Sequence, residues 1–272
     1  MSAPLYEVEH LTRVYGRGER RVVALDDVGL TVARGQRLGI VGESGSGKST
    51  LIRLMAALDR PTAGTVRFAG QQVSGTPERA LGFLRARVQL VFQDPRASLD
   101  PRMRIGTIIA EPLRAPAIQG ELARRGVPVD RSAREARVAD LLAAVGLPAD
   151  AAGRFPHEFS GGQRQRVAIA RALAPGPEVL MADEAVSALD VSVRAQVLNL
   201  LMDLVASLGL TLVFISHDLS VIRHVCTDAI VLQGGRIVEA GPTASVFAQP
   251  QHPYTAGLLA AVPRFGARPW DD

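Results

Sequence analysis

The sequence has a single cysteine, Cys226, so it can form neither an intrachain disulfide nor a metal site built from several thiolates. Aromatic residues make up only 4% of the chain, which argues against a platform of rings for stacking single-stranded nucleic acid. Polar and glycine residues interrupt the longest apolar run, residues 205–215, which is shorter than the about 20 residues that a membrane-spanning helix needs. Residues 1–10 lack the basic and then apolar pattern of a signal peptide. We expect a soluble or peripheral protein, and the cysteine usage fits a reducing compartment.

The excess of charge is also small, because 31 basic and 27 acidic residues leave a formal net charge of +4. Duplex binding relies on many phosphate contacts, so this charge does not favour a nucleic-acid partner. Lys48 is the only lysine, and all other basic residues are arginine. With 272 residues, 47% hydrophobic and 21% charged, the chain has a globular composition and can form one large domain or two joined small ones.

The hydrophobic pattern predicts an α/β fold with a parallel sheet. Helical periodicity is expected at residues 49–58 and 191–208, and no strand-like run interrupts residues 105–147. Strands and helices alternate on both sides of that helical segment, which therefore reads as an inserted subdomain. Short apolar runs predict strands at 6–11, 28–32, 37–41, 65–68, 88–92, 179–182 and 212–215. The predicted buried face of the 191–208 helix contains Val197, Leu200, Leu201, Leu204, Val205 and Leu208.

A glycine-rich segment between a predicted strand and a predicted helix fits the phosphate-loop pattern. Its glycines let backbone N–H groups curl round a phosphate at the positive end of the helix. Lys48 would reach the β- and γ-phosphate oxygens, and the Ser49 hydroxyl would ligate Mg²⁺. A compact ammonium suits this cradle better than a planar guanidinium, which explains the one lysine and disfavours an ordinary glycine-rich turn. The segment consists of Gly42, Glu43, Ser44, Gly45, Ser46, Gly47, Lys48 and Ser49, followed by Thr50.

Two acidic residues, Asp183 and Glu184, follow the predicted strand at residues 179–182. Ligands bind at the carboxyl ends of strands in open α/β sheets. Asp183 would hold Mg²⁺ directly or through water, and Glu184 would polarise an attacking water. The alternative is a solvated acidic pair, which a nearby phosphate loop makes the weaker interpretation.

A second candidate anion site precedes a helical run at Ser160, Gly161, Gly162 and Gln163. Ser160 is a candidate N-cap, and the glycines expose backbone donors at a positive helix end. A capped helix after a turn is the simpler alternative. Beside a phosphate loop, however, two such sites suggest a nucleotide held from both sides.

Gln93 and His217 each follow a predicted strand, so both are expected at the same sheet edge as Glu184. Either residue type can position a water or contact a γ-phosphate. A histidine at a strand end is otherwise most often a surface residue.

Together these residues resemble the nucleotide-binding subunits of ABC transporters, over about residues 6–263. The resemblance implies a P-loop NTPase with a parallel-sheet core, antiparallel N-terminal strands and an inserted α-helical subdomain. It also implies a RecA-like ATP-binding core at residues 1–93 and 165–245. Residues 94–164 would then form the helical signature subdomain, and residues 246–272 a C-terminal tail, loosely held from about residue 265.

The resemblance implies ATP and Mg²⁺ as cofactors and a role for each motif. The signature motif, Ser160 to Gln163, would complete the ATP site of a second subunit in a head-to-tail dimer. Mg²⁺ would be bound by Ser49, Gln93 and Asp183. The phosphate loop corresponds to the Walker A motif, Gln93 to the Q-loop, Asp183 to Walker B, Glu184 to the catalytic base, Asp190 to the D-loop, His217 to the switch histidine and Tyr15 to the adenine-stacking aromatic.

Residues 91–102, 186–192 and 252–255 resemble the oligopeptide, dipeptide and nickel importer branch of that family. Asp100 stands where this branch usually has Asn, and Ala185 where Pro commonly follows the catalytic Glu. Neither departure removes a catalytic group. The single cysteine also cannot build the C-terminal iron–sulfur cluster that some members carry.

The expected function is therefore an ATPase subunit, peripheral at the cytoplasmic face of the cell membrane, that powers a binding-protein-dependent importer of di- or oligopeptides. Its expected partners are two permease subunits, a second identical or paralogous ATPase and an extracytoplasmic solute-binding protein. Import of nickel, glutathione or another small solute is the alternative. A soluble ABC-type ATPase acting on nucleic acid would need a long coiled coil or a second ATP domain. A P-loop kinase would leave Ser160 to Gln163 and His217 unexplained.

Overall fold

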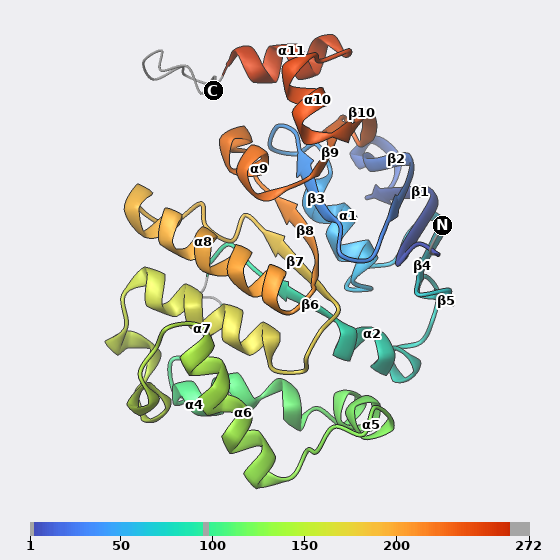
Figure 1. Cartoon of the computed structure of the whole chain (residues 1–272). Helices are drawn as coiled ribbons and strands as arrows, with labels where there is room; N and C mark the ends of the chain where they lie inside the picture. The colour runs from blue at the N-terminus through green and yellow to red at the C-terminus, as the bar shows by residue number, and fades with distance from the viewer. Residues whose placement is uncertain (1–2, 95–97, 262–272) are drawn as a thin grey trace.

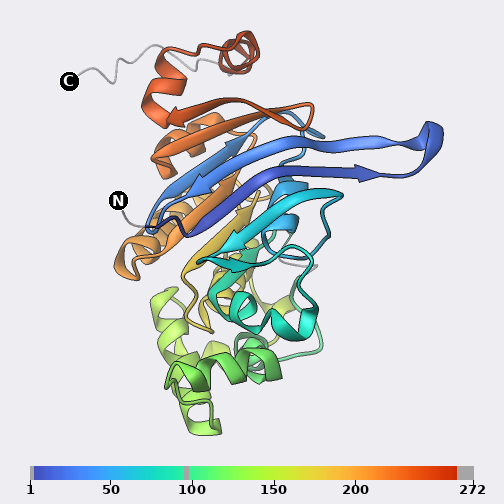
Figure 2. The ribbon, with the colours of Figure 1, turned by 90° about the vertical axis from the view of Figure 1, so that its right-hand side faces the viewer.

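The structure is a computed structural model of the chain, and it describes residues 3–94 and 98–261 (Figure 1). The tail segment expected to be loosely held, residues 265–272, lies outside the described residues. Two sheets and a group of helices make up the fold, with the helical segment α4–α6 and the C-terminal helices at opposite ends of the molecule (Figures 1 and 2).

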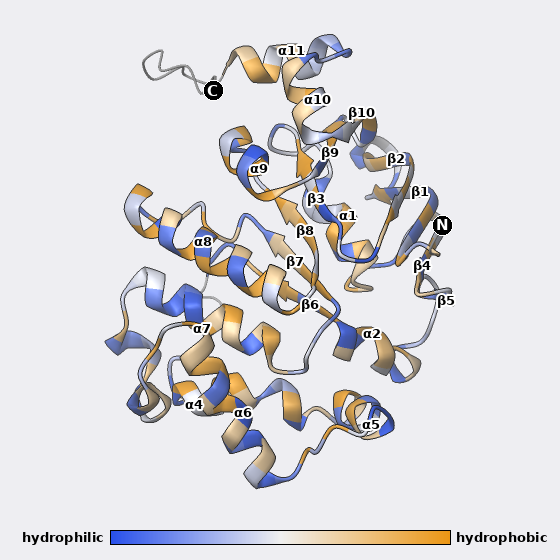
Figure 3. Cartoon of the chain, in the orientation of Figure 1, coloured by the Kyte–Doolittle hydropathy of each residue, from blue (hydrophilic) through white to orange (hydrophobic). Residues whose placement is uncertain are grey.

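A six-stranded sheet forms the centre, in the order β10-β9-β3-β8-β7-β6. Strands β9, β3, β8, β7 and β6 run parallel, and β10 pairs antiparallel with β9 at the edge. Parallel strands buried on both faces read as continuous apolar runs, and Figure 3 shows that hydrophobic colour follows the central strands. The strands are β3 (Arg37–Val41), β6 (Val88–Val91), β7 (Val179–Asp183), β8 (Thr211–Ile215), β9 (Asp228–Gln233) and β10 (Arg236–Pro242).

A four-stranded antiparallel sheet lies beside it, in the order β2-β1-β4-β5. Its strands β1 and β2 form a long hairpin that projects from the body of the molecule (Figure 2). Apolar residues of this sheet and of helix α1 form one core cluster together with residues on one face of the central sheet. The strands are β1 (Tyr6–Tyr15), β2 (Val22–Val32), β4 (Ala63–Phe68) and β5 (Gln71–Gln72).

The other core cluster contains residues of the helical segment and residues on the opposite face of the central sheet. Helix α7 links the two, because it contacts α4 and α6 as well as α8 and β6. The helices are α1 (Lys48–Met55), α2 (Gly82–Arg87), α4 (Ile105–Ala110), α5 (Pro116–Arg124), α6 (Arg131–Ala144), α7 (Gly161–Leu173), α8 (Val191–Ser207), α9 (Leu219–Val225), α10 (Thr243–Ala248) and α11 (Pro253–Ala260), with short 3-10 turns η1 (Gly18–Arg20), η2 (Glu78–Ala80), η3 (Pro112–Arg114), η4 (Ala149–Gly153) and η5 (Pro156–Glu158).

The predicted fold class is confirmed, and each predicted strand is present; β3 has the predicted bounds, and the other strands have shifted ends. Strands β5, β9 and β10 and helices α2 and α9 to α11 were not predicted. The prediction that Leu208 lies on the buried face of helix α8 is wrong. Leu208 follows the last residue of α8 and is 51% exposed. The Leu208 side chain lies outside the core because the helix ends here and the chain changes direction at Gly209, which has a positive φ of 61°.

Helix α8 and its C-cap, Val191–Leu208, are long and apolar enough to span a membrane by length and composition. A core helix of a soluble domain passes the same test. Val197, Leu201 and Leu204 of this helix are buried in the core cluster that also contains the central sheet. The helix is therefore a weak indication of a membrane span.

Two leucines near the end of α8 test this packing. Leu204 is 7% exposed within the core, so Leu204→Ala should lower the free energy of unfolding by about 2–5 kcal/mol. Leu208→Ala should change it by less than about 0.5 kcal/mol, because Leu208 is half exposed. Urea denaturation of both variants measures the difference, and equal losses would contradict the described packing.

Candidate functional site

The predicted site residues gather at the carboxyl ends of adjacent parallel strands. Strand β8 lies between β3 and β7, and β6 lies beyond β7. Residue Ile215 of β8 pairs with Ile40 of β3 on one side and with Asp183 of β7 on the other. The segments that follow these strands therefore meet at one edge of the sheet, where α/β folds bind ligands.

The loop between β3 and α1, residues 42–47, requires glycine at two positions. Gly42 has a φ of +149°, and a Cβ there would lie 2.2 Å from the carbonyl oxygen of Leu232. Gly47 has a φ of +109°, and a Cβ there would lie 2.4 Å from the carbonyl oxygen of Ala24. The chain turns tightly into α1 because neither glycine carries a side chain.

Lys48 begins α1 and is almost fully buried, with 7% of its surface exposed. Its Nζ donates to the carbonyl oxygens of Gly42 at 2.8 Å and Glu43 at 2.7 Å. Burial lowers the pKa of Lys48, and the carboxylates of Glu184 and Asp183 act against that shift. The ammonium is thus folded back on its own loop, where phosphate oxygens can replace the carbonyls as partners.

Asp183 ends β7 and faces the first turn of α1. The Ser49 Oγ donates to Asp183 Oδ1 at 3.2 Å. Burial raises the pKa of Asp183, although the hydrogen bond from Ser49 opposes the change. A hydroxyl and a carboxylate this close are hard oxygen ligands of the kind that Mg²⁺ binds.

Within the described residues, no group of three or more His, Cys, Asp or Glu side chains is arranged to hold a metal alone. Mg²⁺ usually takes only one or two protein ligands and completes its shell with water and substrate phosphates. The Ser49 and Asp183 pair therefore fits Mg²⁺ bound together with a nucleotide.

Glu184 adopts a left-handed backbone conformation, with a φ of +48°, which is uncommon for a residue with a side chain. Its N–H donates to the Ile215 carbonyl at 3.1 Å, and its own carbonyl accepts from the N–H and the hydroxyl of Ser187, each at 3.0 Å. These bonds hold a strained residue in place, as is common at functional sites. The Glu184 Oε1 lies 3.4 Å from His217 Nδ1.

A cavity of about 180 Å³ joins the loop to this acidic residue. Glu184 thus faces the space that backbone donors of the loop surround. Gln93 lies two residues beyond β6, is exposed and does not line this cavity. The lining residues are Ala24, Ser44, Gly45, Gly47, Lys48, Ser49, Thr50 and Glu184.

Tyr15 lies at the end of β1, outside the lining of that cavity. Its hydroxyl donates to Asp59 Oδ2 at 2.6 Å, and the Arg13 guanidinium lies 4.3 Å from the centre of its ring. Arg13 also pairs with Asp59 at 2.8 Å. Tyr15 therefore has a structural role in this triad, and adenine stacking stays a prediction.

Ser160 caps helix α7, as its sequence position predicts. Its Oγ accepts from the Gln163 N–H at 3.3 Å, and the Gln163 side chain accepts from the Ser160 N–H at 2.9 Å. A Cβ on Gly162 would lie 2.3 Å from Val193 Cγ1, so glycine permits the close approach of α7 to α8. Asp190 caps α8 by accepting from the Val193 N–H at 3.0 Å.

The signature residues line a cavity of about 440 Å³ that shares no residue with the cavity at the phosphate loop. Ser160, Gly162, Gln163 and Arg166 contribute to it. Within one chain, the two predicted anion sites are therefore separate.

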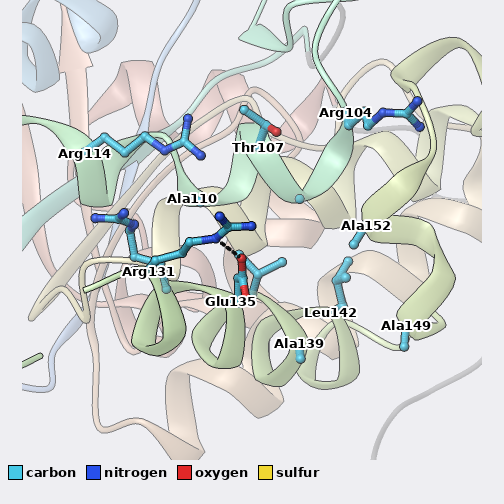
Figure 4. A pocket seen from close by; sticks show the side chains of 13 residues that line it. Arg104, Thr107, Ala110, Arg114, Arg131, Glu135, Ala139, Leu142, Ala149 and Ala152 are labelled. Atoms are coloured by element: carbon cyan, nitrogen blue, oxygen red, sulfur yellow. Dashed lines mark hydrogen bonds and ion pairs between the residues drawn. The ribbon is translucent and has the colours of Figure 1, made fainter. Parts of the chain in front are cut away.

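A further cavity, of about 510 Å³, lies between α4, α6 and η4 (Figure 4). Arg104, Arg114 and Arg131 surround an apolar floor, and Arg131 pairs with Glu135 at 2.8 Å. It contains none of the predicted site residues, so cavity size does not identify the chemical site here.

Known proteins share this arrangement. Residues 25–187 match the family described as ABC transporter, and residues 238–271 match the oligopeptide/dipeptide transporter C-terminal region. The chain belongs to the ABC transporter family. The predicted oligopeptide and dipeptide branch is also confirmed, and as a member of this family the chain is an ATPase.

Two relatives and two solved structures illustrate the similarity. A putative peptide import ATP-binding protein of Brucella abortus (strain 2308) is 50% identical over 267 residues, covering 96% of this chain and 77% of that protein. The dipeptide transport ATP-binding protein DppF of Haemophilus influenzae is 49% identical over 245 residues, covering 90% and 72%. The cbiO1 protein of Clostridium perfringens, part of the ABC transporter complex cbiONQ, has a TM-score of 0.78 at 26% identity, covering 91% and 92%. A dimer of the ATP-binding cassette MJ0796, bound to ADP and Pi after hydrolysis, has a TM-score of 0.75 at 31% identity, covering 88% and 98%.

Two contacts at the site of this ABC subunit were not predicted from sequence. Ser187, the first residue of the segment that resembles the D-loop, donates to the carbonyl of the strained Glu184, and the Tyr254 hydroxyl accepts from the Glu43 N–H at 2.9 Å. Ser187 lies only three positions from Glu184, so a serine-capped turn was a usable signal. Nothing in local sequence connects residue 254 with residue 43.

Lys48→Ala should weaken ATP binding by about 10- to 100-fold, because the variant loses charge-assisted hydrogen bonds to the phosphates. Fluorescent-nucleotide titration measures the change, and the thermal midpoint of the free variant controls for folding. Lys48→Arg should also bind poorly, since a planar guanidinium does not fit the cradle. Wild-type affinity in the folded alanine variant would contradict the assignment of this loop.

Proposed function

We propose that this ABC ATPase powers a binding-protein-dependent importer of di- or oligopeptides. The single observation that carries the proposal is the combination of two features in one chain. The loop with Lys48 faces Glu184 across one cavity, and residues 238–271 match the peptide-transporter C-terminal region. The names of the relatives, peptide import and dipeptide transport, support the same substrate class.

In the proposed reaction the phosphate loop binds the ATP phosphates and Lys48 stabilises the charge of the γ-phosphoryl group. Glu184 orients and polarises the attacking water, and His217, 3.4 Å from its carboxylate, contacts the γ-phosphate. Ser49 and Asp183 would hold Mg²⁺, and Gln93, which lies outside the cavity lining here, would be a further ligand; the bound ion would supply positive charge to the phosphate oxygens.

We infer that two ATPase subunits close head to tail. The signature residues and the phosphate loop line separate cavities in one chain, which supports an assembly in which a second copy or a paralogue brings its own signature motif to the nucleotide. The helix end at α7 suits this task, because its backbone donors and positive dipole favour an anion. The solved relative MJ0796 is described as a dimer, which supports this assembly.

A groove of about 300 Å³ between the central sheet and the helical segment is the proposed docking site for a permease helix. It is lined by residues of β6, η3 and α7, and its lining includes two exposed apolar residues, Leu58 at 51% and Phe92 at 42%. Phe92 directly precedes Gln93, so a helix in this groove would lie next to the residue expected to contact the nucleotide site. Docking there places the subunit at the cytoplasmic face of the membrane, beside two permeases and across from a solute-binding protein.

Glu184→Gln should reduce ATP turnover by about 100- to 10,000-fold while leaving ATP bound, because the base is lost and the phosphate cradle is retained. Phosphate release and ATP-dependent dimerisation on gel filtration measure the two effects. Glu178→Gln is the control: Glu178 precedes the other end of β7, pairs with Arg87 at 2.6 Å, and should retain turnover. Full activity of the Glu184 variant would remove it from the base role.

Purification from native membranes in mild detergent tests the partners. The expected complex contains two multi-span permeases and a second ATPase copy or paralogue, with a solute-binding protein whose bound ligand is a peptide. Leu58→Asp should abolish permease recovery, whereas Leu208→Asp should not, although both leucines are 51% exposed. A binding protein loaded with nickel or glutathione would correct the substrate, and recovery with ribosomes or nucleic acid alone would overturn the importer.

A further inference from the structure

Residues 252–255 lie within the match to the oligopeptide/dipeptide transporter C-terminal region, yet ATP hydrolysis as described above does not use them. They form the start of α11, whose N-cap is His252 and whose first residue is Pro253. The His252 Nδ1 accepts from the Tyr254 N–H at 3.2 Å, and Thr255 is buried. This helix start is therefore built to a fixed geometry.

Glu239 of β10 attaches this helix start to the central sheet. Its two carboxylate oxygens accept from the backbone N–H groups of Gln251, at 2.9 Å, and His252, at 3.1 Å. Burial acts to raise the pKa of Glu239, but these hydrogen bonds outweigh it and the pKa lies below its usual value. The carboxylate is thus charged at neutral pH and holds the segment by two charge-assisted hydrogen bonds.

From this anchor Tyr254 reaches the phosphate loop. Its hydroxyl accepts from the N–H of Glu43 at 2.9 Å, and Lys48 Nζ donates to the Gly42 carbonyl at 2.8 Å. That N–H and that carbonyl belong to the same peptide group. The peptide joining Gly42 to Glu43 is therefore held on one side by the tyrosine and on the other by the ammonium.

We propose that Tyr254 is a positioning residue for ATP binding, which fixes the Gly42–Glu43 peptide and through it the resting place of Lys48. The proposal rests on the assignment of residues 42–49 to the nucleotide phosphates. The hydroxyl contacts the start of the loop, at the Glu43 N–H, and does not occupy the N–H groups at the start of α1. It links the C-terminal segment of this chain to the loop assigned to the nucleotide phosphates.

The effect of Tyr254 on ATP binding is reciprocal. If the hydrogen bond between Tyr254 and Glu43 strengthens ATP binding by some factor, bound ATP must favour the hydrogen-bonded position of the C-terminal segment by the same factor. Nucleotide should therefore protect the amides of residues 249–260 from hydrogen exchange in the wild type, and Tyr254→Phe should reduce that protection.

Tyr254→Phe removes one hydroxyl and keeps the ring. We expect the dissociation constant and the KM for ATP to rise about 3- to 10-fold, the loss expected for one hydrogen bond. The kcat should stay near wild type, because the tyrosine touches no reacting atom. Gln251→Ala is the matched control, since the Gln251 side chain is exposed and only its backbone N–H binds Glu239.

The single lysine provides a direct readout of its position. Lys48 in nucleotide-free protein is acetylated with a small amine-reactive reagent, and mass spectrometry of the peptide that contains Lys48 follows the reaction. The rate of acetylation should be about 3- to 10-fold faster in Tyr254→Phe. Glu239→Ala releases the same segment from the other side and should have a similar effect. The double variant should then lose no more ATP affinity than either single variant, because both changes break the same connection between β10 and the phosphate loop.

Wild-type ATP affinity and wild-type Lys48 reactivity in a folded Tyr254→Phe protein would overturn the proposal. So would fully additive effects of the Tyr254 and Glu239 changes, which would mean independent roles. If Lys48→Ala itself leaves ATP affinity unchanged, the assignment of the phosphate loop is at fault rather than the role of Tyr254.

Discussion

The buried ammonium of Lys48 sets the geometry of the site. A charge removed from water needs compensation, and here the carbonyls of its own loop and the carboxylates of Asp183 and Glu184 provide it. The loop can curl round the ammonium only because Gly42 and Gly47 adopt backbone angles at which a side chain would collide with neighbouring carbonyls. The resting protein thus already carries the positive centre that phosphate oxygens would meet.

The order of the strands explains why distant residues share this centre. Strand β8 separates β3 from β7, so the loop after β3, the acidic pair at the end of β7 and His217 after β8 meet at one edge. The strained backbone of Glu184 is held there by bonds to Ile215 and Ser187. A second helix start, at Ser160, is also capped but lines a separate cavity. In the proposed cycle, dimerisation would bring such a helix start from a second subunit to the nucleotide.

Local patterns predicted much of this protein correctly. The phosphate-loop spacing, the apolar runs of the parallel strands and the N-cap at Ser160 each depend on neighbours within a few residues. Strands β9 and β10 were missed, although an apolar run ending at the Gly234 and Gly235 turn was a hairpin signal. Leu208 was misplaced because periodicity continues past the point where Gly209 ends the helix.

The chemistry of the site is written in local sequence: one lysine in a glycine-rich turn, adjacent carboxylates at the end of an apolar strand, and the order of motifs typical of an ABC ATPase. Which residues contact one another depends on the packing of distant segments. This packing paired Tyr15 with Arg13 and Asp59, and it brought Tyr254 to the Glu43 N–H across 211 positions of chain. Such contacts depend on how the sheets and the C-terminal helices pack, and periodicity and propensity carry no information about partners so far apart in sequence.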